Sequence, residues 1–159
     1  MRDLMQRFEE TAEKIAQEIV AVHADEVDRE GRWPSEAIAA LGEAGLLGLT
    51  VPEAFGGVGA GPRAVAAVVT DLATQCASTA MIFTMHLCAT QVIAQAETFP
   101  LREQVLRAIV AGEHLSTLAF SEKGSRSHFW APVSQAEAHG DVHRLQCGKV
   151  LGNQRGNGG

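Results

Sequence analysis

The sequence predicts a mainly α-helical fold: a bundle of about five helices followed by the first strands of an incomplete β domain. Apolar residues recur at three- and four-residue steps through most of residues 1–113, which is typical of helices that bury one face. Glycine and proline separate these stretches. After His114 the helical period gives way to short, loosely alternating segments, as in strands.

The first two helices are predicted for residues 3–30 and from Ser35 onward. Within 3–30 one stripe is apolar: Leu4, Phe8, Ala12, Ile15, Ile19 and Val22. Gly31 is expected to end this helix. Trp33-Pro34 predicts an extended joint, because the residue before proline avoids the helical region. The hydroxyl of Ser35 is expected to cap the second helix, and Gly45 to end it.

A loop rich in glycine and proline, residues 51–61, precedes three further helices. Its glycines favour a turn-forming loop over a phosphate cradle, because the third glycine of the G-x-G-x-x-G pattern is missing and a helix, not a strand, precedes it. Pro62 is expected to open the third helix and Pro100 the fifth. The fourth, residues 78–96, is apolar nearly all round and is therefore expected at the centre of the bundle.

The chain is thus divided into a helical domain, 1–113, and the beginning of a β domain, 114–149. Strands are expected at 133–138 and 142–147, with a turn at His139-Gly140 between them. Residues 150–159 are polar and rich in glycine, so they are expected to form an unrelated, disordered tail.

Composition excludes several classes of protein. The net charge is −6, and no basic stripe suggests a nucleic-acid partner. The N-terminus lacks the apolar region of a signal peptide. Residues 76–96 lack charge but contain too many hydroxyl and amide side chains for a membrane span, so a cytoplasmic protein is expected. The three cysteines lack metal or redox spacing and are expected to be reduced and buried.

No residue stands out as catalytic, and no pair of histidines has metal-ligand spacing. His86 lies on the apolar fourth helix, where a hydrogen-bonded core histidine is expected. The segment 120–127 combines hydroxyls, glycine and backbone at the end of a predicted strand. It is either a site that presents donors to an anionic or carbonyl-rich ligand, or a plain surface turn.

Several segments, in order, resemble the acyl-CoA dehydrogenase family. Residues 33–57 are similar to that family's helix, glycine turn and "VPEEYGG" loop. Residues 99–112 are similar to the helix that leads into the β domain. Residues 118–128 resemble the flavin loop written "xxTEPGAGSD", and 145–149 resemble "LNGxK". The buried helix around Met85-His86 also fits, so the ordered set covers residues 1–149.

This resemblance implies an FAD-dependent enzyme that dehydrogenates an acyl-CoA thioester between its α and β carbons. Backbone near Leu118 and Phe120, with the Ser121 hydroxyl, would face the flavin, and Ser127 would lie near the FAD or CoA phosphates. The helix 78–93 would border the acyl-chain cavity. Electron-transferring flavoprotein and a homo-oligomeric assembly are implied as partners, and no residue of this chain is assigned a catalytic or metal-binding role.

The chain departs from the family pattern at Lys123, where proline is usual, and at His128, where aspartate is usual. It is expected to be truncated, because the family continues with a β domain and a second bundle that carry the catalytic glutamate. One-base slippage after Lys149 would account for this: a coding sequence for VLGNQRG can also encode the family's SWVTSAG in the neighbouring frame. Sequencing the gene tests that hypothesis.

Two alternatives remain open. The chain is either an inactive helical remnant or partner-binding subunit, or it derives from a related flavin-dependent monooxygenase. In either case the apolar fourth helix is expected to leave an exposed patch that promotes association.

Overall fold

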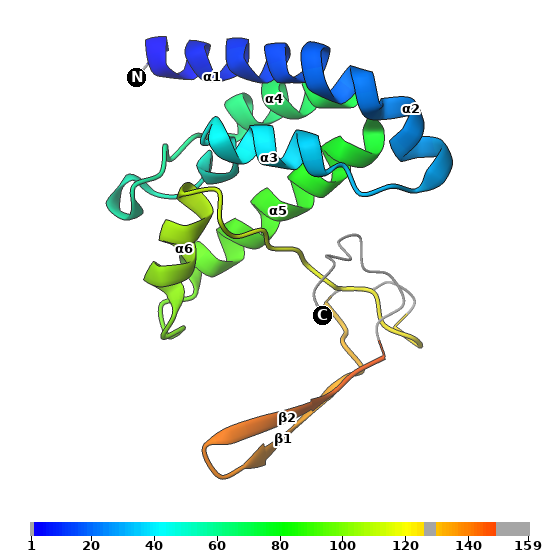
Figure 1. Ribbon diagram of the computed structural model, residues 1–159. Coiled ribbons are helices and arrows are strands. Elements are labelled where there is room, and N and C mark those ends of the chain that lie inside the picture. The colour runs from blue at the N-terminus through cyan, green and yellow to red at the C-terminus, as the bar shows by residue number, and fades with distance from the viewer. Residues whose placement is uncertain (1, 126–129, 149–159) are drawn as a thin grey trace. The chain divides into compact units, whose positions relative to one another are not determined.

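The computed structural model describes residues 2–125 and 130–148 (Figure 1). The chain divides into two compact units, Met1–Ser116 and Thr117–Gly159, which are described separately. In the described part of the chain, unit 1 contains five helical stretches and unit 2 a two-stranded sheet. The predicted fold class is confirmed.

The first helical stretch comprises α1 (Arg2–Ile15), a π-helical turn η1 (Ala16–Val20) and α2 (Ala21–Glu30), which follow one another without a break. It matches the predicted helix 3–30. Its buried stripe includes Ala12, Ala16 and Val20, whereas Val22, which was predicted to lie on this stripe, is exposed. The π turn was not predicted. The helical stretch as a whole ends, as expected, at Gly31, which adopts a left-handed conformation with φ of 63°.

α3 (Ser35–Glu43) begins at Ser35, but the predicted cap is wrong. The Ser35 hydroxyl donates to the Glu36 carboxylate (3.1 Å) and caps no backbone N–H. The helix is started instead by the carbonyl of Pro34, which accepts from the Ile38 N–H (3.0 Å). Ser35 is therefore the first helical residue, one position too late to act as the cap.

The connector after α3 contains two short 3₁₀ turns, η2 (Leu46–Gly48) and η3 (Glu53–Phe55). The predicted glycine-rich loop is confirmed: Gly56 has a φ of 88° and closes the second turn. A Cβ on Gly57 would lie 2.2 Å from the Val51 carbonyl oxygen, so the loop folds back on itself at a point where only glycine fits.

Three helices complete unit 1: α4 (Pro62–Gln75), α5 (Ala77–Gln95) and α6 (Arg102–Val110). Pro62 opens α4 as predicted. Pro100 does not open α6, because Leu101 has a non-helical backbone and the Arg102 N–H closes a turn onto Phe99. The predicted start of this helix was therefore wrong, because α6 begins at Arg102. Gly112, which was expected to close the helix, follows the end of α6 with a φ of 77°.

α5 lies at the centre of unit 1 and contacts α3, α4, α6 and η2 (Figure 1). Its fully buried side chains include Phe83 and His86. By length and composition α5 could span a membrane, with a mean hydropathy of 1.3, and 50% of that stretch is buried inside the protein. A core helix of a bundle meets the same criteria, so these values agree with the predicted central position.

In unit 2, β1 (Gln135–His139) and β2 (Val142–Gln146) form an antiparallel hairpin in which His139 pairs with Val142. Gly140, with a φ of 60°, begins the connecting turn. Every residue of both strands is exposed. A hairpin that buries neither face is only marginally stable by itself.

Candidate functional site

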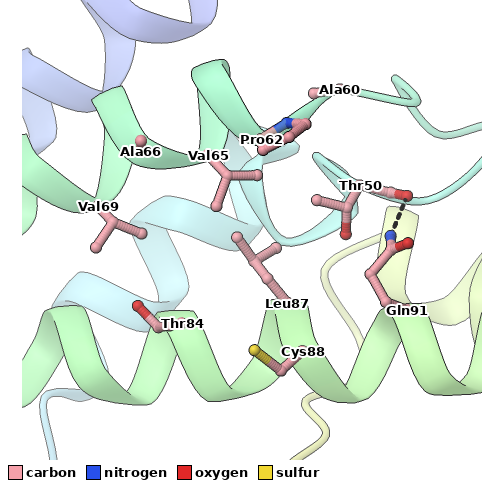
Figure 2. Close-up of a pocket in the computed structure, with 10 residues that line it drawn as sticks. All are labelled: Thr50, Ala60, Pro62, Val65, Ala66, Val69, Thr84, Leu87, Cys88 and Gln91. Carbon is pink, nitrogen blue, oxygen red and sulfur yellow. Dashed lines mark hydrogen bonds between the residues drawn. The ribbon is translucent and has the colours of Figure 1, made fainter.

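A pocket of about 440 Å³ opens between α4, α5 and the connector that precedes α4 (Figure 2). Val65 of α4 points toward Leu87 of α5, and Val69 points toward α5 on the side of Thr84. α4 presents these side chains because its apolar residues recur at helical spacing, and Pro62 sets its first turn. The lining residues are Thr50, Ala60, Pro62, Val65, Ala66, Val69, Thr84, Leu87, Cys88 and Gln91.

The polar groups of the pocket are gathered near α5. The Thr84 hydroxyl donates to the Ala80 carbonyl (2.8 Å), and the Gln91 amide donates to the Thr50 carbonyl (2.8 Å). The Thr50 hydroxyl is buried and, within the described residues, has no hydrogen-bond partner. None of the lining residues is charged. The pocket is therefore lined mainly by apolar and uncharged side chains.

His86, also on α5, is completely buried in the core. Its Nδ1 accepts from the Ser116 backbone N–H (3.1 Å), so its Nε2 carries the proton and donates to the Leu47 carbonyl (3.0 Å). Burial lowers the pKa of His86, more than the bond to Leu47 raises it, and the nearby His114 lowers it further. His86 is thus a neutral structural residue, which confirms the expected core histidine.

Arg102 fixes the glycine-rich loop from the other side. Its guanidinium lies over the Phe55 ring, 5.0 Å from the centroid, and donates to the Ala94 carbonyl at the end of α5. One side chain therefore joins η3, α5 and α6. Together with the bond between Gln91 and Thr50, this contact holds the loop against the helices that shape the pocket.

The cysteines differ from the prediction that all are buried. Cys76 is buried, whereas Cys88 and Cys147 are exposed, and all three are free. Cys88 is exposed because it lies on the pocket side of α5, where α4 leaves an opening. Its immediate neighbours in sequence, Leu87 and Ala89, are apolar, although Thr84 and Gln91 on the same face of α5 are polar.

The flavin-loop residues assigned by resemblance fall in unit 2. Leu118 and Ser121 are partly buried, and the Phe120 side chain is 47% exposed. Among the described residues, neither the Leu118 backbone nor the Ser121 hydroxyl forms a hydrogen bond. Ser127 and His128 lie outside the described residues.

Glu122 holds this loop in place, although the sequence analysis assigned it no role. Its buried carboxylate accepts from the backbone N–H groups of Val133 (2.7 Å) and Ser134 (2.9 Å) and from the Ser134 hydroxyl (2.6 Å). Its backbone carbonyl accepts from the Ser125 hydroxyl (3.0 Å). A buried carboxylate requires such donors. The sequence signal for this role was the position of a single glutamate between the apolar segment 118–120 and Gly124.

Known proteins show which family the helical unit resembles. The profile described as "Acyl-CoA dehydrogenase, N-terminal domain" matches residues 3–113. A probable acyl-CoA dehydrogenase of Mycobacterium leprae is 32% identical over 131 residues, which cover 82% of this chain and 34% of that protein. Mitochondrial isovaleryl-CoA dehydrogenase of Solanum tuberosum is 30% identical over 157 residues, which cover 96% of this chain and 36% of that protein.

The fold is also found among solved structures. A chain from a structure of the electron transferring flavoprotein of Acidaminococcus fermentans superposes with a TM-score of 0.75 at 22% identity. The match covers 89% of this chain and 37% of that chain. This chain spans about a third of the length of the curated relatives it matches. On the profile match and the identities to these relatives, it belongs to the acyl-CoA dehydrogenase family.

Proposed function

We propose that this chain supplies the helical scaffold and flavin loop of an FAD-dependent enzyme that dehydrogenates an acyl-CoA thioester between its α and β carbons. The observation that carries the proposal is the family match across residues 3–113, which spans nearly all of the helical unit. The names of its relatives favour acyl-CoA substrates.

The central helix α5 would border the acyl chain. Besides its buried face, it has a side on which Met81 and Val92 are each more than half exposed. Large apolar side chains at the surface of a helix favour contact with an aliphatic ligand or another protein segment. A hydrocarbon chain laid along this side would cover apolar surface without leaving a polar group unpaired.

The loop in unit 2 would face the flavin. The Leu118 backbone and Ser121 hydroxyl carry no internal hydrogen bond within the described residues, so both fit a ligand edge rich in acceptors and donors. Phe120 would contribute through its backbone, and Ser127 through its hydroxyl near the phosphates. When bound, FAD would supply the hydride-accepting chemistry, and the chain would supply placement. Glu122 would keep the loop in shape.

No residue of this chain is proposed as the base that removes the α-proton. An electron-transferring flavoprotein as electron acceptor, a homo-oligomeric assembly and a cytoplasmic location complete the proposal.

FAD titration of the purified chain, followed by flavin fluorescence and absorbance, tests the proposal. Saturable binding at one FAD per chain is expected, and Ser121→Ala should weaken it about fivefold through one lost hydrogen bond. Ser78→Ala, at an exposed position of α5, is the matched control and should leave binding unchanged. Absence of saturable binding would contradict a cofactor role for this chain.

A second candidate is a non-catalytic subunit that binds a protein partner. The exposed apolar side chains of α5 favour it, since a bundle with such a surface associates readily. A colourless chain that fails to bind FAD but forms a stable complex with a complete relative would support this candidate over the first.

A further inference from the structure

We propose that residues 114–116, the last of unit 1, are held to the central helix α5 by neutral His86 and are released from it in acid while the helical bundle stays folded. The Ser116 backbone N–H donates to His86 Nδ1 at 3.1 Å, and this bond is the contact that acid removes. All the residues involved belong to unit 1, so the release depends neither on FAD binding nor on acyl-CoA chemistry.

Both ring nitrogens of His86 are engaged. Nδ1 accepts from the Ser116 N–H, while Nε2 lies 3.0 Å from the Leu47 carbonyl oxygen, which can only accept. These two partners fit a single state of the ring, the neutral tautomer with its proton on Nε2. In the imidazolium form Nδ1 also carries a proton, so its N–H would face the N–H of Ser116. Protonation of the ring therefore removes the bond that holds Ser116.

His114 adds to this effect from within the same segment. Its Nε2 lies 2.9 Å from the Ser116 hydroxyl oxygen, so two histidines contact one serine. His114 is the titratable neighbour whose charge acts on His86, whereas the backbone groups of Leu47 and Ser116 that touch the ring are uncharged. Like charges on the two rings repel. Protonation of His86 therefore favours departure of the segment that carries His114.

Burial couples proton uptake to this segment. His86 is completely buried in the folded unit, and burial lowers its pKa. His114 and Ser116 are only partly buried, and Leu115 between them packs against the core. If these three residues move away, Nδ1 gains access to a proton while the backbone hydrogen bonds of α5 remain intact. Such a local opening costs less free energy than unfolding of the whole unit.

The pH range of the release follows from linkage. In the opened state the ring is solvated and has its ordinary pKa of 6.5, whereas in the closed state the pKa lies below that value. Above pH 6.5 the ring is neutral in both states and the segment stays closed. Below pH 6.5 the opened state binds a proton that the closed state resists, so the equilibrium constant for opening should rise by up to about tenfold per pH unit.

Amide hydrogen exchange of the purified full chain, followed by NMR between pH 7.5 and 5.5, tests this release. The protection factor of Ser116 should be lower than that of Phe83, a buried residue of α5, at each pH. It should also fall by up to about tenfold per pH unit below 6.5, while the helical circular dichroism stays unchanged.

Two results would overturn the proposal. Protection of Ser116 that does not depend on pH would mean that His86 does not control the segment. Protection of Ser116 equal to that of Phe83 at every pH would mean that the segment is freed only when the whole unit unfolds.

Two variants distinguish the histidines. His86→Asn offers Ser116 an amide oxygen as acceptor and cannot titrate, so the pH dependence of Ser116 protection should disappear. His114→Gln keeps a polar partner for the Ser116 hydroxyl and should retain that pH dependence. The reverse outcome, in which His114→Gln abolishes the pH dependence and His86→Asn retains it, would assign the effect to His114 and refute the role of His86.

The tautomer of His86 provides a test that needs no variant. At pH 7.5 a long-range proton–nitrogen correlation spectrum should show the proton of the neutral ring on Nε2 and none on Nδ1. A proton on Nδ1 at this pH would contradict the proposal, because Nδ1 could not then accept from the Ser116 N–H.

Discussion

At the scale of single residues, His86 makes the helical unit sensitive to acid. Burial holds its pKa below the ordinary value of 6.5, so the folded state resists a proton that the unfolded chain accepts. The contribution of neutral His86 to the stability of the fold is complete above pH 6.5. It is lost as the pH falls below that value. The free energy of unfolding should therefore decrease by up to about 1.4 kcal/mol per pH unit in that range.

The contribution of His86 is isolated by His86→Leu, with urea unfolding measured at pH 7.5 and 5.5. The variant leaves the Leu47 carbonyl and the Ser116 N–H without their partner, so it should lose about 2 to 4 kcal/mol at pH 7.5. It should also lose less stability on acidification than the unmodified chain. An identical pH dependence in both proteins would show that other histidines are responsible.

Glu122 predicts a different effect, confined to unit 2. Glu122→Ala removes the acceptor of the Val133 and Ser134 amides, so hydrogen exchange of these two amides should accelerate at least about tenfold. Glu137→Ala, in the exposed strand β1, is the matched control and should leave them unchanged. Unaltered exchange in the Glu122 variant would mean that the carboxylate does not hold the loop.

At the scale of elements, the connector between α3 and α4 depends on one close approach. Gly57→Ala would push a Cβ to within 2.4 Å of the Val51 Cβ, and should lower the free energy of unfolding by about 3 kcal/mol. A Cβ on Gly61 would meet no atom within 4 Å. Gly61→Ala should therefore lower the free energy of unfolding by only about a few tenths of a kcal/mol, because Gly61 is the N-cap of α4 and alanine is a poorer cap. Equal urea midpoints for the two variants would refute this account.

The elements themselves were largely predictable from periodicity and punctuation. The helix 3–30, the loop 51–61 and the α4 start at Pro62 all follow local rules, and the structure confirms them. Local rules failed at two helix starts. At α3 the carbonyl of Pro34, not the Ser35 hydroxyl, occupies the cap position. At α6 the non-helical backbone of Leu101 places the helix start after Pro100. The π turn η1 likewise has no local sequence signal.

The site was less predictable than the elements. Thr50, Gln91 and Arg102 acquire their roles through contacts between segments distant in sequence, and no spacing rule reveals such pairs. Leu118 and Ser121 were assigned by resemblance to a family motif, and their role toward FAD remains a prediction.

At the scale of the whole molecule, the chain should associate in solution. Met81, Val92 and Leu101 are all more than half exposed, and large exposed apolar side chains promote self-association. Sedimentation velocity should show a mass that rises with concentration. The double variant Met81→Lys, Val92→Lys should suppress this rise, whereas Ser78→Lys, Gln95→Lys, with the same added charge on α5, should do so less. A monodisperse monomer at every concentration would contradict the prediction.

The two hydrogen bonds that tie the connector to α5 have a consequence for how the unit folds. His86 lies 39 residues from Leu47, and Gln91 lies 41 residues from Thr50, whereas α4 and α5 follow each other directly in the sequence. Closing a loop of that length costs chain entropy before either bond compensates for it. We therefore expect α4 and α5 to pair first and the connector to dock on α5 afterwards. The pocket then comes into existence only in the final step of folding, and is the first feature lost when the chain begins to unfold.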